Sequence, residues 1–129
     1  MDFKQMYQND IFATKTGVVM QSLDNESAKM SIVITEVHLN AGRVAHGGVV
    51  FLLCDIAMAA IANQLQYLSV SIQSDIRFLA ASHLGDTLTA VAEPVFGRKS
   101  MFNCRVSVTN QNGEMIAVAE GMFHTKKID

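Results

Sequence analysis

The spacing of apolar residues changes along this chain, and each spacing predicts a different kind of element. Residues 2–13 are expected to form a short amphipathic helix, because apolar side chains recur there at helical intervals. Two strands are expected at about residues 16–23 and 28–37, on either side of a turn at Asp24-Asn25. The helical positions are Phe3, Met6, Tyr7 and Ile11, and one face of the second strand carries Ala28, Met30, Ile32 and Ile34.

The most apolar segment, residues 49–62, follows a loop expected at residues 39–45. Within it only Cys54 and Asp55 are not Ala, Val, Ile, Leu, Met or Phe. β-Branched residues are a minority there, so a helix is favoured over a strand. Fourteen residues are too few to span a bilayer, which needs about 20. A helix that is apolar on nearly every side is expected to be buried on nearly every side.

After residue 67 the spacing becomes two, which predicts strands. Further strands are expected at about residues 87–96, 99–109 and 114–124, and a hairpin at Asn112-Gly113 joins the last two. The first strand of this series is expected to be polar on one face and to carry on the other Val70, Ile72, Ser74, Ile76 and Phe78.

The order of these elements predicts an α+β fold, in which an antiparallel sheet wraps around one central helix. The 129 residues fit a single domain, 1–129, and half of them are hydrophobic, which allows a substantial core. Charged residues make up 17% of the chain, below the roughly 25% typical of soluble domains. We therefore expect partner subunits to cover part of the surface.

Charge and cysteine usage argue against several classes of protein. The formal net charge is -2 and no basic run is present, so nucleic-acid binding is not expected. The first five residues lack the features of a secretion signal, and Cys54 and Cys104 lie in apolar stretches. Both cysteines are expected to be reduced core residues of a cytoplasmic protein that is not bound to a membrane. No close cluster of His and Cys is present, so no metal site is predicted.

Two features of the central helix suggest chemistry. Asp55 lies in its apolar middle, where an acid is usually paired, metal-bound or functional, unless donors at an edge of the fold satisfy it. His46-Gly47-Gly48 precedes the helix, where unpaired backbone amides carry partial positive charge and glycine admits a ligand closely. Such amides could hold a carbonyl oxygen that gains negative charge, as in an oxyanion hole, or the glycines make only a tight turn.

The spacing of these two features predicts a site made by two subunits. Gly48 and Asp55 are seven residues apart, so they share a helix face at an axial separation of about 10 Å. One small substrate group cannot contact both, because reacting groups must lie within about 3–3.5 Å. If both act on one substrate, Asp55 faces the Gly48 end of another subunit's helix. A two-fold dimer with antiparallel central helices would supply that arrangement twice.

Residues 38–55, HLNAGRVAHGGVVFLLCD, contain an Asn, a Gly-containing loop, His-Gly-Gly, and an Asp nine residues after that His. In this the chain resembles the hotdog-fold acyl-CoA thioesterases of the phenylacetate-pathway (PaaI-like) type. The resemblance covers roughly residues 16–125 and includes IRFL at 76–79, GDTLTA at 85–90 and GRKS at 97–100. It departs at Ala80-Ala81, where the family often has Arg-Pro at a strand end near the coenzyme A tail.

The resemblance implies a hotdog fold and a role for each matching residue at the start of the helix. Asp55 would be the general base or nucleophile, and the Gly48 amide would polarise the thioester carbonyl across a dimer interface. Asn40 would position the carbonyl or a water from across that interface. His46 would orient the loop, and Gly47 would lie beside the substrate.

Further residues match the family on the strands. Ser71 would supply a hydroxyl near the reacting carbon, or it is an ordinary strand serine. Arg98 and Lys99 would contact the coenzyme A phosphates, since cations match those charges, or they are only a solvated strand start.

The implied activity is hydrolysis of an acyl- or aryl-acyl-CoA to free acid and CoA, by a dimer or a dimer of dimers (homotetramer). Coenzyme A is part of the substrate, and no cofactor is implied. The main alternative is a non-catalytic acyl-CoA-binding hotdog protein, although a binding pocket has little reason to hold Asp55 beside a thioester. A hotdog dehydratase is a third option, but the pairing of a catalytic His with an acid in such enzymes is not found here. His38, His83 and His124 are assigned no role.

Overall fold

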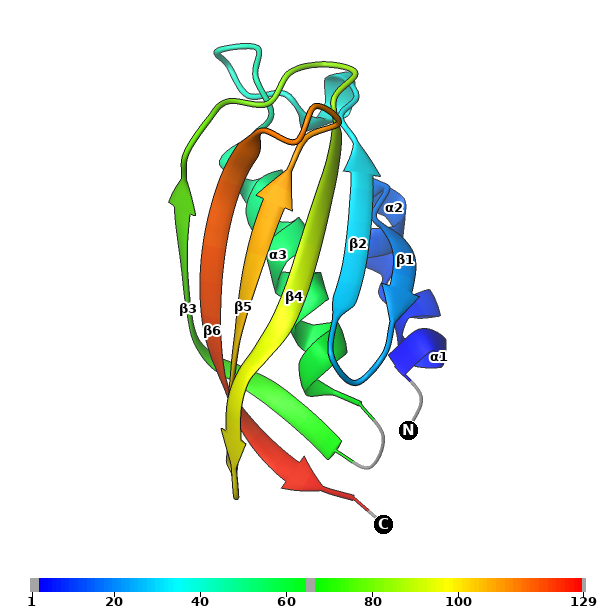
Figure 1. Ribbon diagram of the computed structural model, residues 1–129. Coiled ribbons are helices and arrows are strands. Elements are labelled where there is room, and N and C mark those ends of the chain that lie inside the picture. The colour runs from blue at the N-terminus through cyan, green and yellow to red at the C-terminus, as the bar shows by residue number, and fades with distance from the viewer. Residues whose placement is uncertain (1–2, 65–66, 129) are drawn as a thin grey trace.

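A computed structural model describes residues 3–64 and 67–128 of the chain. A sheet of six strands forms one layer, and the longest helix forms the other (Figure 1). In chain order the elements are α1 (Phe3–Gln8), α2 (Ile11–Thr16), β1 (Val19–Leu23), β2 (Ala28–Val33), the 3-10 helix η1 (Glu36–His38), α3 (Gly47–Ala62), β3 (Tyr67–Phe78), β4 (Thr87–Arg98), β5 (Met101–Thr109) and β6 (Met115–Lys127).

The strands are antiparallel and lie in the order β1-β2-β4-β5-β6-β3, so β1 and β3 are the two edges of the sheet. The helix α3 contacts every strand from β2 to β6, and the sheet curves around it (Figure 1). The expected α+β architecture, an antiparallel sheet wrapped around a long central helix, is therefore confirmed.

The burial of α3 follows from its composition. Nine of its 16 residues are buried, and Leu53, Cys54, Ala57, Met58 and Ala60 have no exposed surface. Seven of its residues are incompletely covered, and four of these recur every three or four positions, which places the four on one stripe of the helix. This stripe carries Gly48, Leu52, Asp55 and Ala59.

The N-terminal segment differs from the expected single helix over residues 2–13, and its first residue, residue 2, lies outside the described residues. Two short helices, α1 and α2, replace the single helix, because the Asp10 carboxylate caps α2 by accepting a hydrogen bond of 2.9 Å from the Ala13 N–H. Gly17 ends α2 in the left-handed conformation, at φ 110°.

The second strand is also shorter than expected, because β2 ends at Val33 and η1 forms at residues 36–38. Ile34 still points into the core and is 1% exposed.

A β-bulge changes the alternation of β3. Its pairing with β6 shifts between Ser71 and Gln73, so the expected faces hold only after the bulge. Ser69 is buried and donates from its hydroxyl to the Ala62 carbonyl at 2.7 Å, whereas Val70 is 64% exposed. The prediction that Val70 shares an inner apolar face with Ile76 was therefore wrong.

No helix among residues 3–64 and 67–128 is both long enough and apolar enough to cross a membrane.

Candidate active site

The start of α3 is organised by His46, which is its N-cap residue. The His46 Nδ1 accepts a hydrogen bond of 2.8 Å from the Gly48 N–H, and the His46 N–H donates to the His38 carbonyl at 2.8 Å. The Gly48 amide is therefore already engaged. The Gly47 N–H has no hydrogen-bond partner among residues 3–64 and 67–128, so it is the open donor at this helix start.

Gly47 lies close to the end of β3. A Cβ added at Gly47 would lie 3.3 Å from the Phe78 ring, so a larger side chain would displace that ring. Gly47 and Phe78 line a cavity of about 380 Å³ together with Ala45, Val50, Leu79, Ala80, Ala81 and Ser82.

Asn40 holds the loop that precedes the helix. Its Oδ1 accepts hydrogen bonds from the Gly42 N–H at 2.9 Å and the Val44 N–H at 3.3 Å. The Nδ2 group makes no hydrogen bond within the described parts of the chain. Any contact of this side chain with a substrate or a water would therefore use Nδ2 as the donor.

Asp55 is half-buried on the open stripe of α3. Burial raises its pKa above the ordinary value of 3.8, and the negative charge of Asp10 raises it further. An acid with a raised pKa is a stronger base once it is ionised, which suits a general base.

The thiol of the neighbouring residue, Cys54, is neutral near pH 7, because burial raises its pKa to about 12. Cys54 is therefore not a nucleophile near pH 7.

Ser71 lies on β3, immediately before the bulge, and its side chain is exposed. Ser69 and Ser71 are two positions apart on β3 before the bulge, so their side chains point to the same face of the sheet. Because Ser69 contacts the end of α3, Ser71 also lies on the helix side of the sheet. Its Oγ lies 3.2 Å from the Ser74 Oγ.

Arg98 and Lys99 lie at the opposite end of α3 from His46. They form the turn between β4 and β5, with Lys99 at φ 54°. They line a cavity of about 340 Å³ with Ile61 and Ala62, the last residues of α3, and with Phe102. The helix has 16 residues and is about 24 Å long, so these cations and the Gly47 amide of one chain are far apart (Figure 1).

The predicted residues thus fall into four places in one chain, one of which is Ser71 on β3. Asn40, His46, Gly47 and Gly48 lie together at the start of α3, Asp55 lies in its middle, and Arg98 with Lys99 lies beyond its end. No group of three or more His, Cys, Asp or Glu residues is arranged to hold a metal ion in the part of the chain that the structure describes.

The sequence profile of the thioesterase superfamily matches residues 42–117, which include the whole of α3 and the residues just before it. The chain belongs to the thioesterase superfamily. Its similarity to the acyl-coenzyme A thioesterase PaaI of Escherichia coli (strain K12) is 32% identity over 119 residues, covering 92% of this chain and 85% of that protein.

Solved structures agree with this assignment. The thioesterase superposes on the E. coli PaaI protein from the phenylacetic acid degradation operon with a TM-score of 0.94 and 30% identity, covering 99% of this chain and 94% of that one. A hypothetical thioesterase from Streptococcus pneumoniae TIGR4, solved with coenzyme A, gives a TM-score of 0.88 and 25% identity, covering 98% of both chains. The predicted hotdog fold, the resemblance to PaaI-like thioesterases and the expectation of a thioester hydrolase are confirmed.

Sequence reasoning missed two residues next to this thioesterase's helix start. His38 was assigned no role, yet it is buried and its carbonyl holds His46. Ser82 is 2% exposed, and its hydroxyl has no hydrogen-bond partner within the described residues. The His38 ring contacts the Thr16 carbonyl, and the Ser82 carbonyl accepts from the Ala45 N–H, so the place of each residue depends on a segment distant in sequence and has no local signal.

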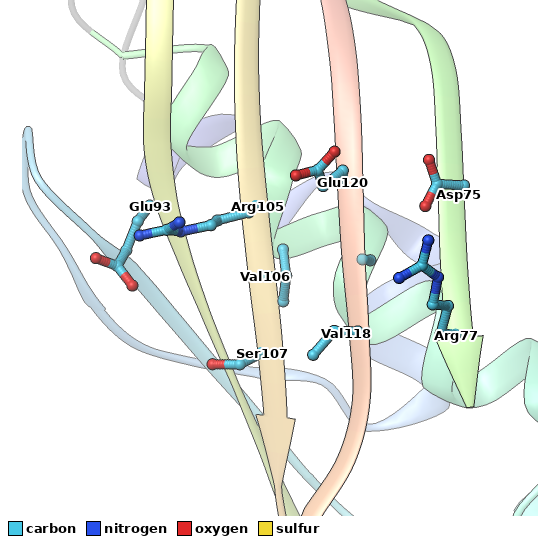
Figure 2. Close-up of a pocket in the computed structure, with 9 residues that line it drawn as sticks. Asp75, Arg77, Glu93, Arg105, Val106, Ser107, Val118 and Glu120 are labelled. Carbon is cyan, nitrogen blue, oxygen red and sulfur yellow. The ribbon is translucent and has the colours of Figure 1, made fainter. Parts of the chain in front are cut away.

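The thioesterase also carries a charged surface on the face of the sheet away from α3. Figure 2 shows Glu93, Arg105, Glu120, Asp75 and Arg77 on four adjacent strands. Glu93 is paired in register with Arg105, and Glu120 lies between Arg105 and Asp75. Within residues 3–64 and 67–128 none of these five side chains makes an ion pair. We call them the outer charged row; it lies outside the candidate active site.

Proposed function

We propose that this thioesterase hydrolyses acyl-coenzyme A thioesters to the free acid and coenzyme A, at a site shared by two copies of the chain. Coenzyme A as the thiol is supported by two similar proteins, one named an acyl-coenzyme A thioesterase and one solved with coenzyme A. The observation that carries the proposal is the separation of the open Gly47 amide from Asp55 on a single buried helix.

The two-copy site follows from that separation. Gly47 and Asp55 are eight residues apart, so about 12 Å of helix axis separates them. A second copy with its α3 antiparallel would bring its Asp55 toward the Gly47 amide, and each dimer would contain two such sites. The β3 edge strand supports this association, because Val70 and Ile72 are 64% and 57% exposed on it.

The chemistry divides between the two copies. The start of one α3 would hold the thioester carbonyl oxygen as it gains negative charge, first through the Gly47 N–H. The Gly48 N–H joins it only when the exposed His46 ring turns away from its 2.8 Å hydrogen bond. Asp55 of the other copy would either take a proton from the attacking water or attack the carbonyl carbon to form an anhydride, which water then hydrolyses. In both routes the C–S bond breaks and coenzyme A leaves as the thiol.

The other predicted site residues can also be placed in a site made by two antiparallel copies of α3. Asn40 would donate from Nδ2 to the carbonyl or the water, and Ser71 would lie near the reacting carbon. An antiparallel second α3 also brings that copy's Arg98 and Lys99 toward the Gly47 end. We therefore propose that Arg98 and Lys99 of the second copy bind the coenzyme A phosphates of the substrate whose carbonyl lies at the Gly47 amide of the first copy.

We further propose that two dimers associate through the outer charged row. Three acids and two arginines lie there without ion-pair partners in the described chain, and opposite charges alternate across β4, β5 and β6. A second copy of the same face can match each arginine with an acid. The charges therefore favour a second dimer as the partner that binds the outer charged row.

The test is release of free thiol from a panel of acyl-CoAs, measured with a thiol reagent. We expect turnover by the unsubstituted chain and none by Asp55→Asn, whose fold and oligomeric state should be unchanged. Near-normal hydrolysis by Asp55→Asn would remove Asp55 from the mechanism. Tight acyl-CoA binding without thiol release by the unsubstituted chain would instead identify a non-catalytic binding protein.

A further inference from the structure

The chain that leads into α3 forms a narrow hairpin over residues 38–46, which we call the entry hairpin. The His46 N–H donates to the His38 carbonyl at 2.8 Å and closes its base. Nearer its tip, the Asn40 N–H donates to the Val44 carbonyl at 2.8 Å. Because α3 begins at the residue that follows His46, the position of the entry hairpin sets the position of the first helical amides.

Contacts with other segments fix both arms of the entry hairpin. On the second arm, the Ala45 N–H donates to the Ser82 carbonyl at 2.8 Å. On the first arm the contact is made by the His38 ring. Its Nδ1 accepts from the Thr35 N–H at 2.9 Å, so its Nε2 carries the hydrogen and donates to the Thr16 carbonyl at 2.6 Å. One imidazole therefore ties the first arm to the last residue of α2.

The tie from His38 to Thr16 is short and buried. Its 2.6 Å is at or below the short end of the roughly 2.7–3.2 Å usual for an N–H···O hydrogen bond. The His38 side chain is 4% exposed, and hydrogen bonds are stronger in such an environment than in water. Both ring nitrogens are engaged within the chain, so His38 has no free polar atom to offer a substrate. Any effect of this ring on the reaction must pass through the entry hairpin.

The group that this hairpin positions is the open Gly47 amide. His46 precedes Gly47 directly, and the His46 N–H is held by the backbone of His38, so the first arm and the helix start move together. A donor stabilises an oxyanion only when it lies about 2.7–3.1 Å from that oxygen. A displacement of about 1 Å can cost about 10²-fold in rate. Loss of the tie to Thr16 should therefore be felt at Gly47.

We infer that His38 is a positioning residue for thioester hydrolysis, which holds the Gly47 amide at the thioester carbonyl through the entry hairpin. This inference rests on the proposed function, because it takes that amide to polarise the carbonyl. His38 touches neither the substrate nor the reacting atoms. Since the oxygen gains its negative charge only in the transition state, loss of the ring should lower kcat and leave substrate binding almost unchanged.

The first test is the division of the loss between kcat and binding in His38→Leu, which lacks both ring hydrogen bonds. The probe is whichever of acetyl-, hexanoyl- and phenylacetyl-CoA the unsubstituted chain hydrolyses fastest. We expect kcat to fall by about tenfold to a hundredfold. On the Asp55→Asn background, the Kd of the same ester in calorimetric titration should change by no more than about twofold. An unchanged kcat would overturn the inference.

Two conservative variants separate the two ring hydrogen bonds. The amide nitrogen of His38→Gln can take the place of Nε2 and donate to the Thr16 carbonyl. The amide oxygen of His38→Asn can take the place of Nδ1 and accept from the Thr35 N–H, but this shorter side chain does not reach Thr16. We expect His38→Gln to keep kcat within about threefold and His38→Asn to lose as much as His38→Leu. Equal kcat in His38→Gln and His38→Asn would overturn the role of the Thr16 tie.

A double-mutant cycle with Gly47→Pro tests whether His38 acts through the Gly47 amide. If it does, His38→Leu should cause no further loss of kcat once that amide is absent, because the two substitutions remove the same interaction. Losses that multiply would show that His38 acts elsewhere, and would overturn the inference while leaving the hydrolase standing. Full activity of Gly47→Pro alone, or no hydrolysis by the unsubstituted chain, would instead overturn the proposed function.

Tyr7→Phe is the matched control for a purely structural role. The Tyr7 hydroxyl donates to the Val18 carbonyl, so this variant also removes a side-chain hydrogen bond to a backbone carbonyl of the N-terminal segment. That bond joins α1 to the residue before β1 and not to the entry hairpin. Tyr7→Phe should lower the Tm and leave kcat unchanged, at a temperature where circular dichroism shows every variant folded. A loss of kcat in Tyr7→Phe equal to that in His38→Leu would overturn the inference.

Discussion

At the scale of single residues, the open amide at the start of α3 is a sharply testable feature. Gly47 is the first helical residue after the N-cap, a position where proline is well tolerated. His46 before it has φ -61° and ψ 137°, an extended conformation that suits a residue preceding proline. Gly47→Pro therefore removes one N–H and leaves the helix in place. We expect kcat to fall by about 10²–10³-fold, as for loss of an oxyanion-hole donor.

Gly47→Ala is the control for this substitution. It keeps the N–H and adds a Cβ that would also lie 3.3 Å from the Phe78 ring. Circular dichroism should show intact secondary structure in both variants, and Gly47→Ala should retain more activity than Gly47→Pro. Equal activities in the two variants would show that the Gly47 amide has no part in the reaction.

Asp55 should control the pH dependence of both activity and stability. Its pKa lies above 3.8 because of burial and then the charge of Asp10, so the acid limb of kcat/KM should also lie above 3.8. The folded state prefers the neutral acid, so ionisation of Asp55 lowers the free energy of unfolding as pH rises through its folded pKa. Asp55→Asn removes that penalty.

The stability difference has a defined pH range. Asp55→Asn should be more resistant to urea than the unsubstituted chain at pH 7, and the difference should shrink as pH falls through the folded pKa of Asp55. Below the unfolded value of 3.8 it should vanish, since the acid is then neutral in both states. The opposite result would be an Asp55→Asn variant that is less stable than the unsubstituted chain at pH 7 but not at pH 4. It would show that a partner stabilises the Asp55 carboxylate in the folded state.

At the scale of elements, the sequence predicted those whose signals are local. The helix over 49–62 was predicted from composition alone and was found as α3, beginning two residues earlier at Gly47. The hairpin at Asn112-Gly113 was predicted from its turn residues, and Gly113 does adopt a positive φ of 79°.

The elements that were predicted wrongly depend on contacts between distant segments. The bulge in β3 follows from its register with β6, which no pattern within β3 encodes. The role of His38 needs Thr16, 22 residues away. The break between α1 and α2 is the exception, because Asp10 before Ile11 is a recognisable cap that the apolar spacing concealed.

At the scale of the whole molecule, the candidate site could be predicted as a set of residues but not as a set of distances. The motif predicts Asn40, His46, Gly47, Gly48 and Asp55 as site residues, and the axial spacing along α3 is the reason for proposing a site made by two copies. The separation of Arg98 and Lys99 from the helix start appears only in the fold, where the β4–β5 turn lies at the other end of α3 (Figure 1).

A shared site makes a prediction that a site within one chain does not. Asp55→Asn lacks the acid and Gly47→Pro lacks the amide, so each variant alone should have at most about a hundredth of the unsubstituted activity. When the two are co-expressed in equal amounts, a quarter of the sites should combine an intact Asp55 from one chain with an intact Gly47 from the other. About a quarter of the unsubstituted activity should therefore return, for dimers and for dimers of dimers alike. If each site lay within one chain, the mixture would be no more active than its parents, because every chain would carry one of the two defects.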